Sequence, residues 1–230
     1  MRRAPAHAQR GAALLLLVAV LGLGTATLLI SAFGRNGAEA GRQQRTLATL
    51  AQAREALLGF VASNGRLPRP AASAIDGRER GLECASDADC SGFLPWVALG
   101  VEGSDAWGKV LRYSVTPELS RLPIVSYSAV ANRVVLQRNA QGTLQYVAGQ
   151  EQCDISAQCL PMVVFSQGKD GYGTAASGAV LANTLRGNVD EASNDSASRA
   201  FVTGNGFDDM LAWITLPLMY QRMRAARTLP

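Results

Sequence analysis

The sequence is nearly devoid of histidine: His7 is the single one among 230 residues. Because His7 stands in a short basic segment at the start of the chain, the domain that follows can hold no Ser/His/Asp or Cys/His catalytic arrangement. A Ser166/Lys169 pair would be the remaining nucleophile, but a serine in a glycine-rich loop is far more typical of a turn. A phosphate-binding loop and a dinucleotide fingerprint are also missing. We therefore predict that the protein is not an enzyme.

The sequence also lacks a surplus of charge outside its first residues. The formal net charge is +4, but three of the 22 basic residues are Arg2, Arg3 and Arg10. Without residues 1–11 the chain has 19 basic and 18 acidic residues. Nucleic-acid binding needs a concentrated basic face, so we expect no nucleic-acid partner.

Charge is completely missing from Ala12 to Phe33, directly after Arg10-Gly11. At about 1.5 Å per residue, this stretch would reach about 33 Å as a helix, enough to cross a bilayer. Basic residues before the stretch place the N-terminus in the cytoplasm and the rest of the chain outside. We expect a basic leader at 1–11 and a transmembrane helix at 12–33. These residues alone also suit a simple signal-anchor.

The helix is expected to continue as an amphipathic segment at 34–64. Leu47, Leu50, Leu57, Leu58 and Val61 recur at helical intervals. Ser63-Asn64-Gly65 is typical of a left-handed C-cap, and the prolines that follow prevent continuation.

The remaining residues, 65–230, are predicted to form one α+β domain outside the cytoplasm. Short alternating runs bounded by Pro, Asn or Gly predict strands at 110–115, 124–130, 134–138, 144–147 and 162–165. An edge strand is expected at 207–214 and a short helix at 217–227. Residues 173–206 show little periodicity and are expected to be a long surface loop.

Cysteines are few but closely paired, as Cys84/Cys90 and Cys153/Cys159. Local disulfides are the simplest interpretation in an oxidising compartment. A zinc site is the alternative, although the spacing is wider than in the usual knuckle and histidine is missing nearby.

Three short motifs follow one another in the domain. They are Asp105–Tyr113 (DAWGKVLRY), Ser166–Gly171 (SQGKDG) and Phe207–Trp213 (FDDMLAW). In this order they resemble the motifs of type IV pilins and type II secretion pseudopilins, and Arg10-Gly11 resembles the leader of those families. The resemblance implies a long N-terminal helix, membrane-spanning in its first half, packed on a small antiparallel sheet.

The same resemblance implies how the chain is processed and where it acts. A prepilin peptidase would cut after Gly11 and leave a methylated Ala12 as the new N-terminus. The partners would be other pilin or pseudopilin subunits and an inner-membrane assembly platform. The protein would sit in the bacterial inner membrane with its domain in the periplasm, and could assemble into a filament of a type IV pilus or a type II secretion pseudopilus.

Two positions depart from the family pattern. Ala106 replaces a usual proline, and Leu16 stands where most members have a glutamate. Subunits without that acid resemble those placed at a filament tip, which points to a minor or specialised subunit. The alternative is a membrane-anchored periplasmic binding module that never polymerises.

In the major pseudopilins, the second and third motifs hold calcium together. The resemblance therefore implies that Asp170, Asp208 and Ser166 could contribute to a calcium site, and no other cofactor is expected. Turn chemistry is the alternative, because Asp170-Gly171 is a good tight-turn pair.

Overall fold

The structure is a computed structural model, and it describes most of the chain in seven ranges. They are 9–121, 123–124, 126–155, 159–181, 188–196, 199–204 and 207–229, with side chains of the first helix described at 15–21 and from 37 onward. By its contacts the chain forms two compact units, 1–44 and 45–230. The boundary between them falls inside the helix α1 (Gln9–Asn64).

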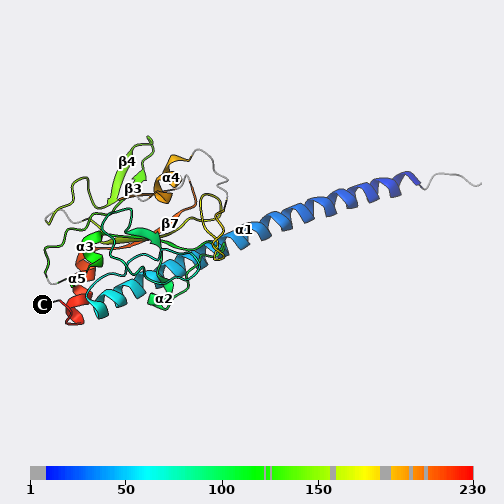
Figure 1. Ribbon diagram of the computed structural model, residues 1–230. Helices are drawn as coiled ribbons and strands as arrows, with labels where there is room; N and C mark the ends of the chain where they lie inside the picture. The colour runs from blue at the N-terminus through cyan, green and yellow to red at the C-terminus, as the bar shows by residue number, and fades with distance from the viewer. Residues whose placement is uncertain are drawn as a thin grey trace, which may run out of the picture. The chain divides into compact units, whose positions relative to one another are not determined.

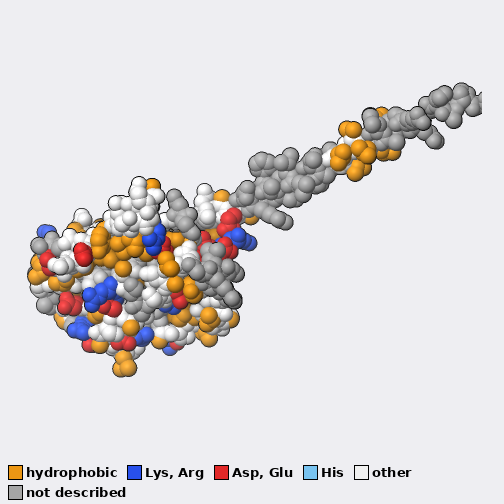
Figure 2. All heavy atoms as spheres, turned by 90° about the horizontal axis from the view of Figure 1, so that it is seen from above, with side chains coloured by type: hydrophobic (Ala, Val, Ile, Leu, Met, Phe, Trp, Pro, Cys, Tyr) orange, Lys and Arg blue, Asp and Glu red, His pale blue; other side chains and the backbone are white. Residues whose placement is uncertain are grey.

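The first unit corrects the expected membrane span. Of the predicted span 12–33, the side chains at 15–21 are described, and they are apolar and exposed (Figure 2). Where description resumes, the helix carries Glu39 and Arg42. Within the described ranges, none of the helices combines the length and the apolar character that crossing a membrane requires. This finding overturns the membrane-spanning half of the helix and the single-pass inner-membrane localisation derived from it.

The last part of α1, from Arg45 to Asn64, belongs to the second unit and confirms the predicted amphipathic helix. Leu50, Leu57, Leu58 and Val61 are all buried, and burying each such side chain contributes about 1.5–3 kcal/mol. The helix ends as expected, because Gly65 has φ +68° and donates its N–H to the carbonyl of residue 61 at 2.9 Å.

Leu47 departs from the buried face formed by the other apolar positions at helical intervals. Its side chain is 53% exposed, whereas its neighbour Thr46 is fully buried. The Thr46 hydroxyl accepts a hydrogen bond from the backbone N–H of Ala106 at 3.1 Å. A polar residue therefore takes the inward position on this turn because it joins α1 to the loop of the first motif.

The domain contains two sheets, which corrects the expectation of one small antiparallel sheet. The first sheet is antiparallel, in the order β1 (Ser91–Phe93), β2 (Arg112–Val115), β5 (Met162–Ser166) and β7 (Met210–Ile214). The second has the order β4 (Leu144–Ala148), β3 (Val134–Arg138) and β6 (Ala200–Thr203). In the second sheet β3 pairs with β4 antiparallel and with β6 in parallel.

The extra strand explains why the second sheet was not foreseen. Strand β6 comes from the segment 173–206, which was expected to be a loop, and its four residues are too few to show a period-two alternation. Conversely, the strand predicted at 124–130 is wrong, since its described residues form turns and irregular chain.

The elements of the domain pack in layers around the first sheet (Figure 1). One core joins the second part of α1 to this sheet and to α5 (Leu216–Ala225). A second core joins the other face of the sheet to β3 and β6, with the rings of Phe165 and Phe201 5.5 Å apart. Strand β5 is buried on both faces, which explains its continuous apolar run. The short helices α2 (Trp96–Leu99), α3 (Pro117–Ser120) and α4 (Val189–Asp195) complete the domain.

Candidate functional site

The structure brings two of the predicted calcium ligands into contact. Strands β5 and β7 are antiparallel, with Ser166 opposite Met210. The loop after β5 and the segment before β7 therefore lie at the same end of this strand pair. The Asp208 Oδ2 accepts a hydrogen bond from the backbone N–H of Asp170 at 2.6 Å. Gly168 allows this approach, because it has φ +56° and a Cβ there would lie 2.5 Å from the Asp208 Cγ.

Ser166, the third predicted ligand, has a different task. Its hydroxyl is fully buried, donates to Asp105 Oδ2 at 2.6 Å and accepts from the N–H of Gly168 at 3.0 Å. The other oxygen of Asp105 accepts from the N–H groups of Trp107 and Lys109, both at 2.9 Å. Burial raises the pKa of Asp105, although these hydrogen bonds oppose the shift. Ser166 thus links the first motif to the second.

A lysine that sequence reasoning passed over lies at the centre of the loop. Lys109 is only 3% exposed, and its Nζ donates to the backbone carbonyls of Gln167, Asp170 and Tyr172 at 2.9, 2.7 and 3.1 Å. No periodicity in the sequence marks this burial, because the partners of Lys109 are backbone carbonyls.

Three carboxylates lie beside the loop and form an acidic cluster, Glu191, Asp208 and Asp209. An oxygen of each lies within 4.8 Å of the others. Glu191 is 1% exposed, and among the described residues neither of its oxygens has a hydrogen-bond partner, nor has Oδ1 of Asp208. Gly171 makes room for Glu191, since a Cβ there would lie 2.6 Å from its Oε1.

The acidic cluster holds protons unusually tightly. Burial and the neighbouring Asp208 carboxylate raise the pKa of Glu191 to about 7. Burial also raises the pKa of Asp209 to about 7, even though Asn194 Nδ2 donates to its Oδ2 at 2.7 Å. Like charges in a desolvated site disfavour the ionised forms, which accounts for both shifts.

Glu191 was missed because it lies in the segment expected to be a loop. It belongs to the first turn of α4, where the Asn188 side chain accepts from the N–H groups of Asp190 and Glu191. An Asn followed three residues later by Glu is a recognisable helix start. This signal could have indicated the helix.

The predicted calcium set, Asp170, Asp208 and Ser166, does not match the needs of Ca²⁺ well. Calcium takes about six to eight oxygen ligands, often including backbone carbonyls. Here the Lys109 ammonium already occupies the loop carbonyls, and the Ser166 hydroxyl is committed to Asp105. Calcium binding by these residues stays a prediction.

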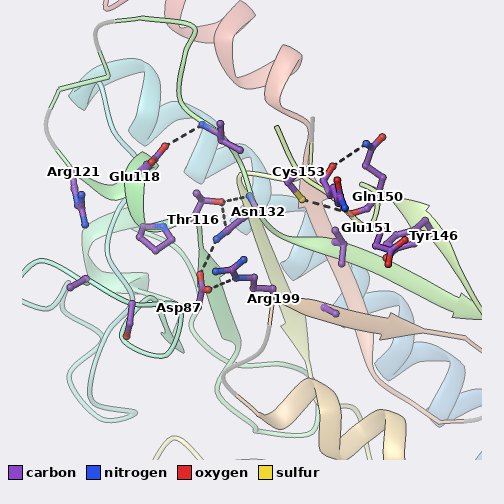
Figure 3. A pocket seen from close by; sticks show the side chains of 17 residues that line it. Asp87, Thr116, Glu118, Arg121, Asn132, Tyr146, Gln150, Glu151, Cys153 and Arg199 are labelled. Atoms are coloured by element: carbon purple, nitrogen blue, oxygen red, sulfur yellow. Dashed lines mark hydrogen bonds and ion pairs between the residues drawn. The ribbon is translucent and has the colours of Figure 1, made fainter. Parts of the chain in front are cut away.

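A second candidate site is an open cleft of about 910 Å³, and residues of both disulfide loops contribute to its lining (Figure 3). Asp87 lies on one side of this cleft, with Cys153 and Tyr146 on the other. Asp87 binds Arg133 at 2.6 Å and also pairs with Arg199. Burial by itself would raise the pKa of Asp87, but the two guanidinium groups hold it below its ordinary value.

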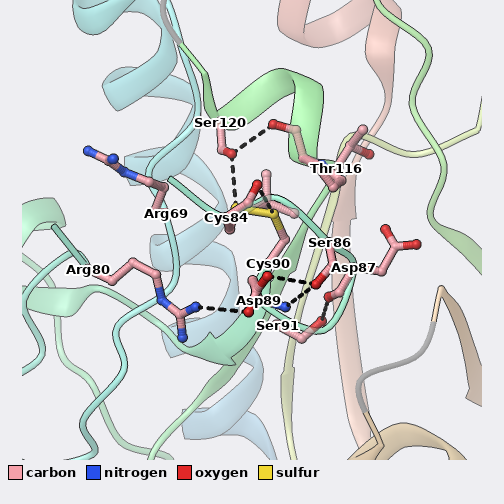
Figure 4. The surroundings of a disulfide bond; sticks show 12 residues. Arg69, Arg80, Cys84, Ser86, Asp87, Asp89, Cys90, Ser91, Thr116 and Ser120 are labelled. Carbon is pink, nitrogen blue, oxygen red and sulfur yellow. Dashed lines mark hydrogen bonds and ion pairs between the residues drawn. A yellow bond between two sulfur atoms is a disulfide. The ribbon is translucent and has the colours of Figure 1, made fainter. Parts of the chain in front are cut away.

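Both predicted disulfides, Cys84–Cys90 and Cys153–Cys159, are present, and no cysteine is free. This excludes the zinc alternative, because all four thiolates are used. The first disulfide is buried beneath α3, with Ser120 beside it, and its loop projects Asp87 into the cleft (Figure 4). The two bridges therefore fix the walls of the cleft.

The predicted processing site, Gly11-Ala12, lies in α1, and the side chains of these two residues are outside the described part of the chain. His7 lies entirely outside the described residues. Processing there stays a prediction.

No known family model matches this chain, and neither a curated protein nor a solved structure is significantly similar to it. The resemblance to pilins therefore rests on the motifs alone.

Proposed function

We propose that this protein is a pilin-like structural subunit that is cleaved after Gly11 and assembles with other subunits through the start of α1. The observation that carries the proposal is an uncovered apolar helix surface. Six large apolar side chains are 59–71% exposed there: Leu15, Leu16, Leu17, Val18, Val20 and Leu21. Apolar surface of this density marks an interaction site, since leaving it in water is unfavourable.

Helices of neighbouring subunits suit this surface best. Long side chains that point outward on several sides of a helix can be buried only by several partners at once, as in a bundle of parallel helices. The α+β domain would then form the outside of the assembly. Mechanical work of this kind needs no catalytic group in the chain, and an assembly ATPase would be a separate protein.

The lack of an acid at position 16 favours a minor subunit at the filament tip. A carboxylate buried among apolar helices is costly unless a neighbouring amine neutralises it. A tip subunit has no neighbour above it whose amine could pair with a carboxylate at position 16. Leucine is therefore the favourable residue at this position in a tip subunit.

Processing is tested by co-expression with a prepilin peptidase and mass spectrometry of the intact product. We expect a chain that starts at Ala12, and Gly11→Leu should leave the precursor uncut. Gly37→Leu is the matched control, because a side chain there meets nothing within 4 Å. A wild-type product that starts at any other residue would contradict the proposal.

Assembly is tested separately by cross-linking. Val18→Cys and Ile75→Cys introduce thiols at positions that are 59% and 68% exposed, one on the apolar helix and one on the domain. We expect a photo-reactive cross-linker attached to the introduced thiol to join Val18→Cys to another filament subunit and Ile75→Cys to none. Equal cross-linking at both positions would argue against assembly through α1.

The cleft favours a second candidate, a module that binds a secreted protein without polymerising. Tyr146 lines the cleft and is 47% exposed, whereas Tyr127 is 45% exposed and is not part of its lining. A photo-reactive phenylalanine analogue at each position distinguishes the two functions. Specific capture at Tyr146 alone, together with an uncut N-terminus, would favour the binding module.

A further inference from the structure

The Lys109 ammonium occupies a position that has the chemistry of a metal site. All three of its N–H donors are used, each by a backbone carbonyl of the loop 167–172. Converging backbone carbonyls are the typical ligands of a hard cation such as Ca²⁺. In this loop they converge on the nitrogen of a side chain instead.

Carboxylates surround this cation as they would surround a metal. Burial is the larger influence on the pKa of Lys109 and lowers it. Four carboxylates oppose this effect because their charges favour the ionised lysine: Asp208, Asp105, Asp209 and Glu191. Asp105 additionally holds the backbone N–H of Lys109 at 2.9 Å. The first, second and third sequence motifs therefore meet around one positive charge.

The loop is shaped to admit the lysine stem. A Cβ on Gly173 would lie 2.6 Å from the Cδ of Lys109 and 3.1 Å from its Cε. Real Cβ atoms essentially never approach another atom to 2.6 Å, so a larger residue at 173 would force the lysine stem to shift. Glycine at 173 and lysine at 109 thus fit each other.

We propose that the Lys109 ammonium is the resident cation of this loop and replaces a bound divalent metal. Removing the ammonium therefore creates a divalent-cation site. This site is bounded by the carbonyls of Gln167, Asp170 and Tyr172 and by Asp208. A cation that is covalently tethered cannot dissociate. The loop is then held closed in any calcium concentration, including where calcium is scarce. The role of Lys109 does not depend on how the chain assembles.

The chain offers its own control, because it contains only two lysines and the second, Lys169, lies exposed in the same loop. Thermal unfolding of the full chain is measured for the wild type, Lys109→Met and Lys169→Met, in EDTA and in CaCl2 at equal ionic strength. We expect the wild type and Lys169→Met to unfold at the same temperature in both buffers. Lys109→Met should lose about 5–10 °C in EDTA and recover much of this loss in CaCl2.

Three results would overturn the proposal. The first is a wild type that CaCl2 stabilises as much as it stabilises Lys109→Met, because a metal would then bind beside the lysine. The second is a Lys109→Met variant as stable as the wild type. The third is a loss of stability that CaCl2 does not restore, which would make the ammonium a packing contact and no stand-in for a metal.

Amine labelling covers the case in which Lys109→Met fails to fold. Wild-type protein in EDTA is treated with an acetylating reagent and digested, and the two lysine peptides are quantified over time. We expect Lys169 to react at once and Lys109 only when the protein unfolds. Reaction of both at the same rate would show that the ammonium does not hold the loop, and the proposal would fail.

Discussion

The acidic cluster predicts an unusual dependence of stability on pH. Glu191 has its pKa raised from 4.5 to about 7 in the folded protein. Between these values the folded state keeps a proton that the unfolded chain releases. Because the folded state binds more protons there, the free energy of unfolding falls as the pH rises through this window. Most small proteins gain stability over the same range as their carboxylates ionise.

The magnitude follows from the size of the shift. One pKa unit corresponds to about 1.4 kcal/mol, so Glu191 alone accounts for a loss of about 3 kcal/mol between its unfolded and folded pKa values. Asp209, whose pKa is also raised to about 7, acts in the same direction. The two contributions are not additive, since the Glu191 carboxylate is itself one of the groups that raise the pKa of Asp209.

Glu191→Gln removes this effect while keeping the shape of the side chain. The groups that face Glu191 are Asp208, Asp209, Asp170 and the Lys109 ammonium, and they stay in place. We expect the variant to have a flatter profile and to exceed the wild type in stability near and above pH 7. The assay is urea unfolding followed by circular dichroism across the window, in EDTA, with the exposed Glu102→Gln as the matched control. A wild type whose stability rises with pH, or a variant with the wild-type slope, would refute the reasoning.

Three further predictions concern the core of the domain. Arg133 is fully buried and donates to Ser114 Oγ, Asp87 and the Val115 carbonyl. Arg133→Met should therefore lower the free energy of unfolding, measured in urea, by about 3–5 kcal/mol. Replacement of an exposed arginine, Arg121→Met, should lower it little. Gly168→Ala and Gly108→Ala both place alanine at positive φ, but only the alanine at 168 meets neighbouring atoms. We expect Gly168→Ala to lower the free energy of unfolding by about 1–3 kcal/mol more than Gly108→Ala. Equal losses would contradict the close approach of residue 168 to the segment before β7. Non-reducing peptide mapping should find each disulfide within its own short loop, and a bridge between the two loops would disprove the pairing.

The sequence was informative wherever a pattern had room to repeat. The second part of α1 buries Leu50, Leu57, Leu58 and Val61 over about three turns. Four-residue β6 and seven-residue α4 are too short for any period to show. The second sheet was missed for this reason.

The candidate site was foreseen in its location and not in its chemistry. The loop after β5 and Asp208 do come together, and two motifs that resemble known ones were enough to predict it. The buried Lys109 could not be predicted, because lysine is almost never buried unless it is paired, and its partners are backbone carbonyls, which no sequence displays. Glu191 arrives from a helix some twenty residues beyond the loop, by folding alone.

The disulfide connectivity has a consequence for how the chain matures. Each bridge joins cysteines that are consecutive in the sequence, Cys84 to Cys90 and Cys153 to Cys159. A chain that enters an oxidising compartment from its N-terminus exposes its cysteines in the same order. An oxidase that joins each new thiol to the one before it therefore produces the native bridges without waiting for the domain to fold. With this connectivity, no isomerase would be needed to correct the pairing.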